Sequence, residues 1–517
     1  MARAANTSTG AQSLRGLSTP LKNLALISAA IFVGIAGGVL TYIGAEMSIA
    51  VPPALMIAIP AGLIAVWRPR IGMLGFLFLV LFMEEFPGGI SEDDVTRSER
   101  TLFYAMALGL PAVYLPDLMI AGLLFLYLVK FVVKKEHIPL QCDKIGFGLL
   151  MVFGSLILSI MISYGGEETF GPVVLGTTLG FFEDIELPDN IARLISILQI
   201  KLFILVFPSY LLGLFFFREE RDLRHALWVF TAAMTATALM ALARLASNPG
   251  MVVQMTTVIV DTSSVWLLAL ASFYMISLWT LGYYRGWGTT LRVLGCSLFI
   301  VLILLSFRRT IWGAMAMAAL FWPLILPRRG WGKLLFLIAA GIIAMGLFFT
   351  ITPVGRVILA SVIARMGETN LAQGSTLYRF AMMVWFFENI WDLPFFGYGL
   401  RPLWDVTIQI RLFLVNMESV HSLYLWILLR MGIFGILCWI VASYLVISRI
   451  KDVYLLLYDE KGKILAGVIL LSLVMFFFNG ITNPVYGQVR HMILLGLELA
   501  LITRLPYMLR SKLNSDP

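Results

Sequence analysis

Long apolar runs follow one another through almost the whole chain, separated by short polar loops. A bilayer core of about 30 Å requires about 20 apolar residues in a helix, and a helix satisfies its own backbone polar groups. The pattern therefore predicts an all-α polytopic membrane protein. We expect about fourteen transmembrane helices, at residues 24–44, 50–67, 71–84, 115–134, 145–164, 191–217, 225–245, 263–283, 291–306, 311–326, 332–352, 432–449, 464–479 and 486–503.

Composition supports this class. Hydrophobic residues make up 60% of the 517 residues, charged residues make up 13%, and the mean hydropathy is +0.90. Soluble domains have far more charge and less apolar content. The net charge of +8 would suit a nucleic-acid partner, but Lys and Arg concentrate in short loops between apolar runs, which is the orientation signal of membrane proteins. We therefore predict the lipid bilayer, and no nucleic acid, as a partner.

The basic loops predict the orientation of the helices. Most of them fall on one side, which the positive-inside rule makes cytoplasmic, together with both termini. The predicted organisation is a cytoplasmic tail, eleven transmembrane helices, a periplasmic loop with amphipathic helices, transmembrane helices 12 to 14 and a second cytoplasmic tail. These parts span residues 1–21, 22–352, 353–431, 432–503 and 504–517, respectively.

Arg308 and Arg309 stand on the outer side at the start of a span, against this rule. The long outer segment adds five more arginines, Arg356, Arg365, Arg379, Arg401 and Arg411. The guanidinium fork fits phosphate oxygens, so the group predicts an anionic partner such as a diphosphate. For any single arginine, contact with lipid headgroups is the alternative.

The outer segment contains three recognisable parts. Residues 374–391 have apolar positions at helical spacing around Arg379, which predicts an amphipathic helix at the interface. Residues 393–399 have the Pro and Gly content of a tight turn. Residues 420–435 are apolar but interrupted by Arg430 and Gly432, so we expect a re-entrant or interfacial helix that begins at His421.

Two other ionisable residues are candidates for chemistry. Lys201 lies about ten residues into an apolar run, where a charge is a functional-site hypothesis by default, although pairing with a carboxylate is the alternative. His421 could accept a proton from a sugar hydroxyl, or it could simply be a histidine at a helix end. The sequence has no HExxH, DxD, Gly-rich phosphate loop or GxSxG, so we predict no metal and no cofactor.

Four elements together resemble the shared pattern of bacterial O-antigen ligases and O-antigen polymerases over roughly residues 300 to 450. They are Arg309-Thr310, Tyr378-Arg379, Pro394 with Gly397-Tyr398-Gly399, and the run from His421 to Leu425 followed by Gly432 and Gly435. The resemblance implies a metal-independent, inverting glycosyltransferase in the bacterial inner membrane. It also implies an active site that faces the periplasm and a glycan carried by undecaprenyl diphosphate.

The resemblance also assigns residues. It makes His421 the general base and gives catalytic roles to Arg309 and Arg379. Candidate substrate-binding residues are Arg308, Lys201, Arg193, Tyr378, Tyr424 and Arg401, with Lys201 or Arg193 as the upstream basic residue. The chain departs from the pattern at Arg308, where Ser is common, and at Arg430, where an acidic residue is frequent, and both departures leave the acceptor open.

The leading prediction is a polymerase of O-antigen or exopolysaccharide, which transfers a glycan from undecaprenyl diphosphate to a sugar hydroxyl of another lipid-linked unit. The alternative within the family is a ligase that transfers the glycan to lipid A core. A transporter of polysaccharide or lipid-linked substrate is the alternative of another class, but the unusual charges gather at one face rather than near the midplane. The expected partners are the lipid-linked glycan donor, a glycan or lipid-linked acceptor and, as a further candidate, a chain-length regulator.

Overall fold

The computed structural model describes most of the predicted helical body. The described residues are 64, 67–82, 115–134, 143–165, 173–174, 186–187, 204–247, 262–283, 287–306, 309–352, 355–356, 359–360, 383–384, 386–388, 395–397, 407–410, 413–416, 422–482 and 489–510.

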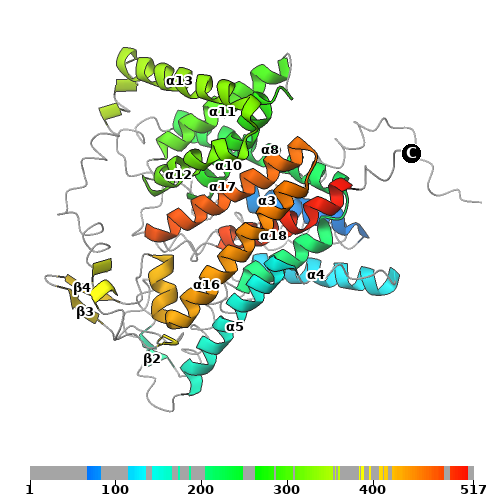
Figure 1. Cartoon of the computed structure of the whole chain (residues 1–517), viewed down its shortest axis with the longest axis vertical. Coiled ribbons are helices and arrows are strands. Elements are labelled where there is room, and N and C mark those ends of the chain that lie inside the picture. The colour runs from blue at the N-terminus through cyan, green and yellow to red at the C-terminus, as the bar shows by residue number, and fades with distance from the viewer. Residues whose placement is uncertain are drawn as a thin grey trace, which may run out of the picture.

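Helices dominate these residues and pack into a bundle (Figure 1). The labelled helices are α3 (Pro69–Phe82), α4 (Leu115–Lys134), α5 (Lys144–Gly165), α8 (Glu220–Ser247), α10 (Thr262–Thr280), α11 (Trp287–Leu305), α12 (Arg309–Ile325), α13 (Arg328–Ile351), α16 (Leu423–Leu456), α17 (Glu460–Thr482) and α18 (Val489–Arg510). A further apolar helix spans Ile204–Phe216.

Two short antiparallel ribbons add strand to the helical body. β1 (Val173–Val174) pairs with β2 (Glu186–Leu187), and β3 (Thr407–Ile410) pairs with β4 (Phe413–Asn416). In the second ribbon Thr407 lies opposite Asn416 and Ile410 lies opposite Phe413. The helical class predicted from the sequence is confirmed for the body of the protein, and the two ribbons are additions that hydropathy did not reveal.

Among the described residues, five helices are long and apolar enough to cross a membrane. They are Glu220–Ala246, Ser263–Thr280, Leu423–Leu456, Glu460–Ile481 and Val489–Leu509. Six shorter apolar helices, from Pro69–Phe82 to Thr310–Ile325, accompany them. The predicted span at 115–134 coincides with α4, and most other spans that the structure describes agree to within a few residues. The predicted spans 432–449 and 486–503 are too short, because α16 covers Leu423–Leu456 and α18 continues to Arg510. Of the predicted span 191–217, only the part from residue 204 is described. The total of about fourteen stays a prediction, because residues 1–63 lie outside the described part.

Consecutive helices run in opposite directions, so that their ends meet at two levels. At one level, which we call the basic end, Arg70 in the first turn of α3 contacts Glu219, just before α8, at 2.8 Å, and Arg329 of α13 pairs with Glu460 of α17. The hydrogen bond from Arg70 holds the pKa of the Glu219 carboxyl below its usual range. The opposite level, the far end, contains the first residues of α12, α16 and α18.

Side-chain caps begin the helices at both levels. The carboxylate of Asp143 accepts from the amide of Gly146 at the start of α5, at 2.9 Å. Asp459 accepts from Gly462 in the first turn of α17, at 3.3 Å. Ser422 is the N-cap of α16 and accepts from the amide of Leu425. Each cap satisfies an amide that has no partner within its own helix, which defines where the helix begins.

The helix α16 contains a sharp break at Gly432. This residue has φ 65° and ψ −164°, so a short helix from Leu423 is separated from the long helix that continues to Leu456. Only glycine adopts such angles at low cost. The interruption predicted within residues 420–435 is therefore present, and the structure locates it at Gly432 rather than at Arg430, which lies in the short helix.

Candidate functional site

The far end of α17 connects two motif segments that are distant in the sequence. Phe478 contacts α12 near its start, and Phe477 and Gly480 contact the start of α16. The first of these helices begins at Arg309, and the second begins two residues after His421. The last turn of α17 therefore brings these two motifs to one place in the structure.

Close packing fixes the first turn of α12. The indole of Trp312 donates to the carbonyl of Ile303 at 2.9 Å, which ties α12 to the end of α11. A Cβ atom at Gly313 would lie 2.9 Å from the ring of Phe478, so only glycine allows α12 and α17 to approach this closely here. Arg309 lies one turn before Gly313 and is the first residue of α12.

The start of α16 is held on the same turn of α17. The hydroxyl of Ser422 donates to the carbonyl of Gly480 at 3.4 Å, and the hydroxyl of Tyr424 donates to the carbonyl of Phe477 at 2.8 Å. Gly480 belongs to the last turn of α17, where carbonyls lack partners within the helix, and Phe477 lies about one turn earlier. Ser422 thus caps its own helix and also contacts the neighbouring one, which fixes the chain directly after His421.

Two glycines with positive φ lock an outer turn onto the break in α16. Gly397 has φ 75° and Gly432 has φ 65°. A Cβ atom on Gly397 would lie 2.5 Å from the amide nitrogen of Gly432, and one on Gly432 would overlap the carbonyl oxygen of Phe395. The amide of Phe434 donates to that same carbonyl at 3.1 Å. The backbones of the two segments therefore touch directly, with no side chain between them.

The short helix of α16 also contacts α5. The hydroxyl of Ser159 in α5 donates to the carbonyl of Arg430 at 2.8 Å, and Arg430 itself is fully buried. A wholly buried arginine is rare in proteins because desolvating its charge is costly. Arg430 therefore belongs to the interior of the site and not to its open surface.

A second buried arginine, Arg490, closes the far end of α3. Its guanidinium donates to the carbonyls of Val80 and Leu81 and to the hydroxyl of Ser264 at 2.7 Å. The carbonyls are those of the last turn of α3, which lack helical partners. Arg490 thus joins α18, α3 and the start of α10, and its charge is used by the fold rather than offered to a substrate.

The predicted site residues divide into two groups. Tyr424 is described, and its hydroxyl is engaged by Phe477, while Arg309 is placed as the first residue of α12. The remaining predicted residues lie outside the described part of the chain, and their roles stay predictions. These are Arg193, Lys201, Arg308, Tyr378, Arg379, Arg401 and His421.

Sequence reasoning missed the residues that support the motifs. Phe478, Ser159 and Trp312 carry no chemical signature, so nothing in the sequence marked them. The pair Asn479-Gly480, in contrast, interrupts an apolar run near its end. A polar residue followed by glycine at that position is a recognisable sign of a helix end with a special role.

The site chemistry favours an anion. The N-termini of α12 and α16 both meet the last turn of α17, and the amides of a helix N-terminus, together with its dipole, attract negative charge. Arg309 is the residue at which the first of these helices begins. The two helix starts are therefore favourable surroundings for an anionic group.

Comparison with known proteins agrees with the motifs. Residues 294–440 match the model of the O-antigen ligase family. The matched part runs from within α11, through α12 and α13, to the first part of α16, and it therefore includes both motif helices. A search of curated proteins found no match to this chain. Residues 294–440 of this multi-pass membrane protein are thus similar to the O-antigen ligase family, and the match confirms the resemblance seen in the motifs.

Proposed function

We propose that this protein is a polysaccharide polymerase. It transfers a glycan from undecaprenyl diphosphate to a sugar hydroxyl of a second lipid-linked unit, with inversion at the anomeric carbon and without a metal ion. The reaction occurs at the far end of the bundle, which faces the periplasm of a bacterial inner membrane. The match over residues 294–440 supports this class of reaction.

The observation that carries the proposal is the meeting of α12 and α16 on the last turn of α17. Phe478 packs against Gly313, one turn after Arg309, and the carbonyl of Gly480 holds Ser422, the residue after His421. A cationic helix start and the segment of the proposed base are thus side by side. A transferase that displaces a diphosphate needs this combination, because it must stabilise the leaving group and deprotonate the acceptor in one place.

The proposed reaction uses groups of the protein alone. The acceptor oxygen attacks the anomeric carbon of the donor sugar. The bond between that carbon and the diphosphate oxygen breaks, and its electron pair leaves with the diphosphate. His421 takes the proton of the acceptor hydroxyl. Arg309, Arg379 and the amides at the start of α12 stabilise the charge that develops on the leaving group, with Arg308, Arg401 and an upstream basic residue as further binding groups.

A ligase that transfers the finished glycan to lipid A core is the second candidate, and the description of the matched family favours it. The two reactions share the glycan donor and differ only in the acceptor. We place the polymerase first because the chain has 517 residues, whereas ligases of the family it resembles tend to be more compact. Arg430 also departs from the family pattern on the acceptor side, but its burial points to no particular acceptor.

The test uses purified protein, a polyprenyl-diphosphate-linked glycan and a metal chelator, with no nucleotide. A ladder of longer lipid-linked products on a gel would support the polymerase. A single product that requires added lipid A core would support the ligase instead. Recovery of unchanged donor, with transport into vesicles, would overturn both and favour a transporter. Arg309→Ala protein is the negative control for chemistry in each arm.

A further inference from the structure

The middle of α18 contains an ionisable residue that the proposed reaction does not use. Glu498 is the tenth of the 22 residues of α18, a helix that is long and apolar enough to cross a membrane. An ionisable side chain at such a depth is costly, usually faces the interior of the bundle and often marks a functional site. The contacts of Glu498 therefore indicate what such a site binds.

The carboxyl group of Glu498 contacts a hydroxyl and not a cation. The hydroxyl of Ser472 on α17 donates to Glu498 at 3.0 Å, and the indole of Trp266 on α10 donates to Ser472 at 3.3 Å. Within the described part of the chain, no basic side chain pairs with Glu498. An ionised carboxyl group without a cation is costly in a membrane span, so this arrangement favours the neutral acid.

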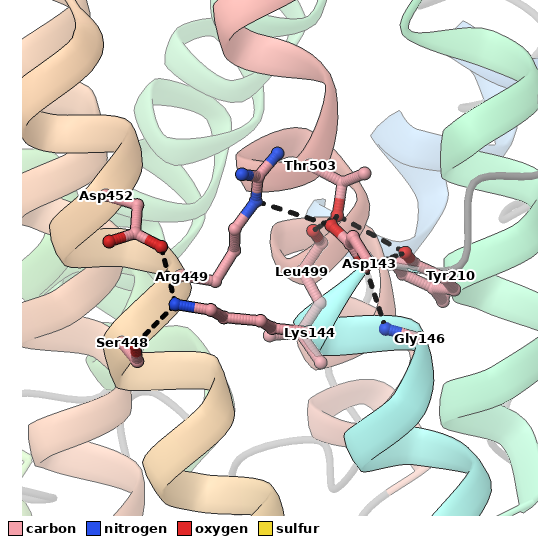
Figure 2. Close-up of polar contacts among 9 residues, drawn as sticks. All are labelled: Asp143, Lys144, Gly146, Tyr210, Ser448, Arg449, Asp452, Leu499 and Thr503. Carbon is pink, nitrogen blue, oxygen red and sulfur yellow. Dashed lines mark hydrogen bonds and ion pairs between the residues drawn. The ribbon is translucent and has the colours of Figure 1, made fainter.

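Asp143, just before α5, has different surroundings (Figure 2). Its carboxylate pairs with the guanidinium of Arg449 at 3.4 Å and accepts a hydrogen bond from the hydroxyl of Thr503 at 3.0 Å. The neighbouring Lys144 pairs with Asp452 at 2.7 Å. A cation beside a carboxylate compensates its charge. The carboxylates in this group therefore have cationic partners, whereas the carboxyl group in the middle of α18 has a hydroxyl.

A second polar pair lies on the same face of α18, two turns nearer the far end. The ring nitrogen Nδ1 of His491 lies 3.1 Å from the hydroxyl of Ser263 on α10. His491 precedes Glu498 by about 10 Å along the helix, and a helical side chain leans towards the N-terminus of its helix, so Glu498 leans towards His491. The ring of Trp266 packs against that of His491, with centroids 4.7 Å apart, and its indole nitrogen donates to Ser472. Trp266 therefore connects the two polar pairs.

A small cavity lies between the two pairs. Its polar lining consists of Ser263, Trp266, Ser472, His491 and Glu498, and its other walls are apolar. The enclosed space is about 10 Å³. That is close to what one water molecule requires, and a buried water needs about two to four polar partners, which this lining offers. One water molecule can therefore connect Glu498 to His491.

Other ionisable side chains on the helices around Glu498 are engaged elsewhere. Arg449 of α16 pairs with Asp143, and the hydroxyl of Tyr210, in the helix before α8, lies 3.3 Å from the same carboxylate. Arg490 and Arg504 of α18 donate to backbone carbonyls at the ends of neighbouring helices. Of the titratable groups that the structure describes, only the histidine of α18 shares the lining of the cavity with the glutamate.

We propose that Glu498 and His491 form a proton-binding site inside the membrane, connected by one water molecule and reached from the far end of the bundle. Glu498 holds the proton as a neutral acid. When the proton leaves, the O–H bond of the carboxyl group breaks, the water accepts this proton and gives one of its own to the imidazole, and Ser472 stays hydrogen-bonded to the carboxylate. The imidazolium releases a proton at the far end, where His491 lies in the first turn of α18. This site goes beyond the proposed function and does not depend on glycan transfer.

The experiment records infrared spectra of the full-length protein in lipid nanodiscs at neutral pH. We expect the C=O stretching band of a protonated carboxyl group, and we expect its loss in Glu498→Gln, which keeps the shape of the neutral acid. Glu460→Gln removes a carboxylate that is paired with Arg329, so this control should keep the band. Thermal unfolding checks that each variant is folded.

A second measurement follows the shift of this band after transfer into D₂O, which reports exchange of the proton. We expect His491→Phe to slow the exchange by about tenfold or more, because the proton then exchanges only when the helices separate locally. His225→Phe is the matched control, since His225 is similarly buried but belongs to α8 at the basic end. His491→Gln keeps a polar group beside Ser263 but cannot carry the proton, so it should behave as His491→Phe.

The two measurements decide the proposal together. Loss of the band in Glu498→Gln, with slower exchange in the His491 variants, supports the site. A wild-type spectrum without the band, or persistence of the band in Glu498→Gln, would show that Glu498 is not a neutral acid and would overturn the proposal. Exchange at the wild-type rate in both His491 variants would also overturn it, because the proton would then reach Glu498 by another route.

Discussion

The amide of Phe434 donates a hydrogen bond to the carbonyl of Phe395 across a 3.1 Å gap, although the two residues belong to separate segments of the chain. Around this bond, Gly397 and Gly432 press their backbones together, and the rings of Phe396 and Phe434 lie 5.5 Å apart. The turn at residues 395–397 of the outer segment and the break in α16 are therefore one structural unit. The position of the short helix, and of the residues just before it, depends on this unit.

Alanine at Gly397 should break this unit. The added Cβ would meet the carbonyl of Arg430 at 2.6 Å, and alanine at φ 75° is itself strained. We expect a loss of about 2 kcal/mol or more in stability and a larger loss in glycan transfer. Gly154→Ala is the matched control, because open space surrounds that helical glycine. Unfolding curves in detergent that are equal for both variants would show that the backbones do not touch as described.

The substitution Arg309→Lys should distinguish the effect of the positive charge on glycan transfer from the effect of the planar guanidinium group. The substitution keeps the positive charge at the start of α12 but removes the planar fork that binds two phosphate oxygens at once. Transfer should fall well below wild type while the protein still accumulates in the membrane, and Arg308→Lys should cause a smaller loss. Arg328→Lys, at the first residue of α13, is the control. Full activity of Arg309→Ala would move the diphosphate site elsewhere.

Glutamine at His421 should stop transfer but not binding of the glycan donor. An imidazole that takes the acceptor proton contributes about 100- to 10,000-fold, and glutamine can form a hydrogen bond but cannot take the proton. His421→Ala should be equally inactive with nearly normal donor binding, because the arginines hold the diphosphate. His137→Gln, in a predicted cytoplasmic loop, should have no effect. Polymer formation at a normal rate by His421→Gln would reduce His421 to a positioning residue.

The orientation of the bundle can be tested with single cysteines. In a chain without its three natural cysteines, we expect a membrane-impermeant thiol reagent to label a cysteine at Ser375 in intact spheroplasts and to leave one at Ser515 unlabelled. The physical reason is that basic loops remain in the cytoplasm during insertion. Permeabilised cells, in which both positions should react, provide the control. The reverse pattern would place the site on the cytoplasmic face.

The two carboxylates that join α5 to its neighbours, Asp143 and Asp452, should contribute unequally to stability. Asp143 is mostly buried, caps α5 and binds Thr503 and Arg449, so Asp143→Ala should destabilise the protein by about 1 to 3 kcal/mol. Asp452 pairs with Lys144 where both side chains are substantially exposed, so Asp452→Ala should cost less than about 1 kcal/mol. Thermal unfolding of both variants provides the comparison. Equal losses would show that the Asp143 contacts do not join the helices.

Local pattern alone determined the helical elements. The apolar run at 115–134 became α4 without change, and the interruption within 420–435 became the break in α16, because a membrane helix needs only its own length of apolar residues and glycine marks where that helix can bend. The motifs around Arg309 and His421 were also sufficient to predict the family resemblance, which the match over residues 294–440 confirmed.

Tertiary structure decided which of these elements meet. Arg490 binds the carbonyls of Val80 and Leu81, which are about four hundred positions earlier in the chain, and Phe477 and Gly480 hold the residues that follow His421. The pattern of apolar residues along one segment identifies a helix, but it does not identify the helix against which that segment packs. Side-chain shape, such as the space left by Gly313 for Phe478, selects the partner. That selection assembled the candidate site around the end of α17.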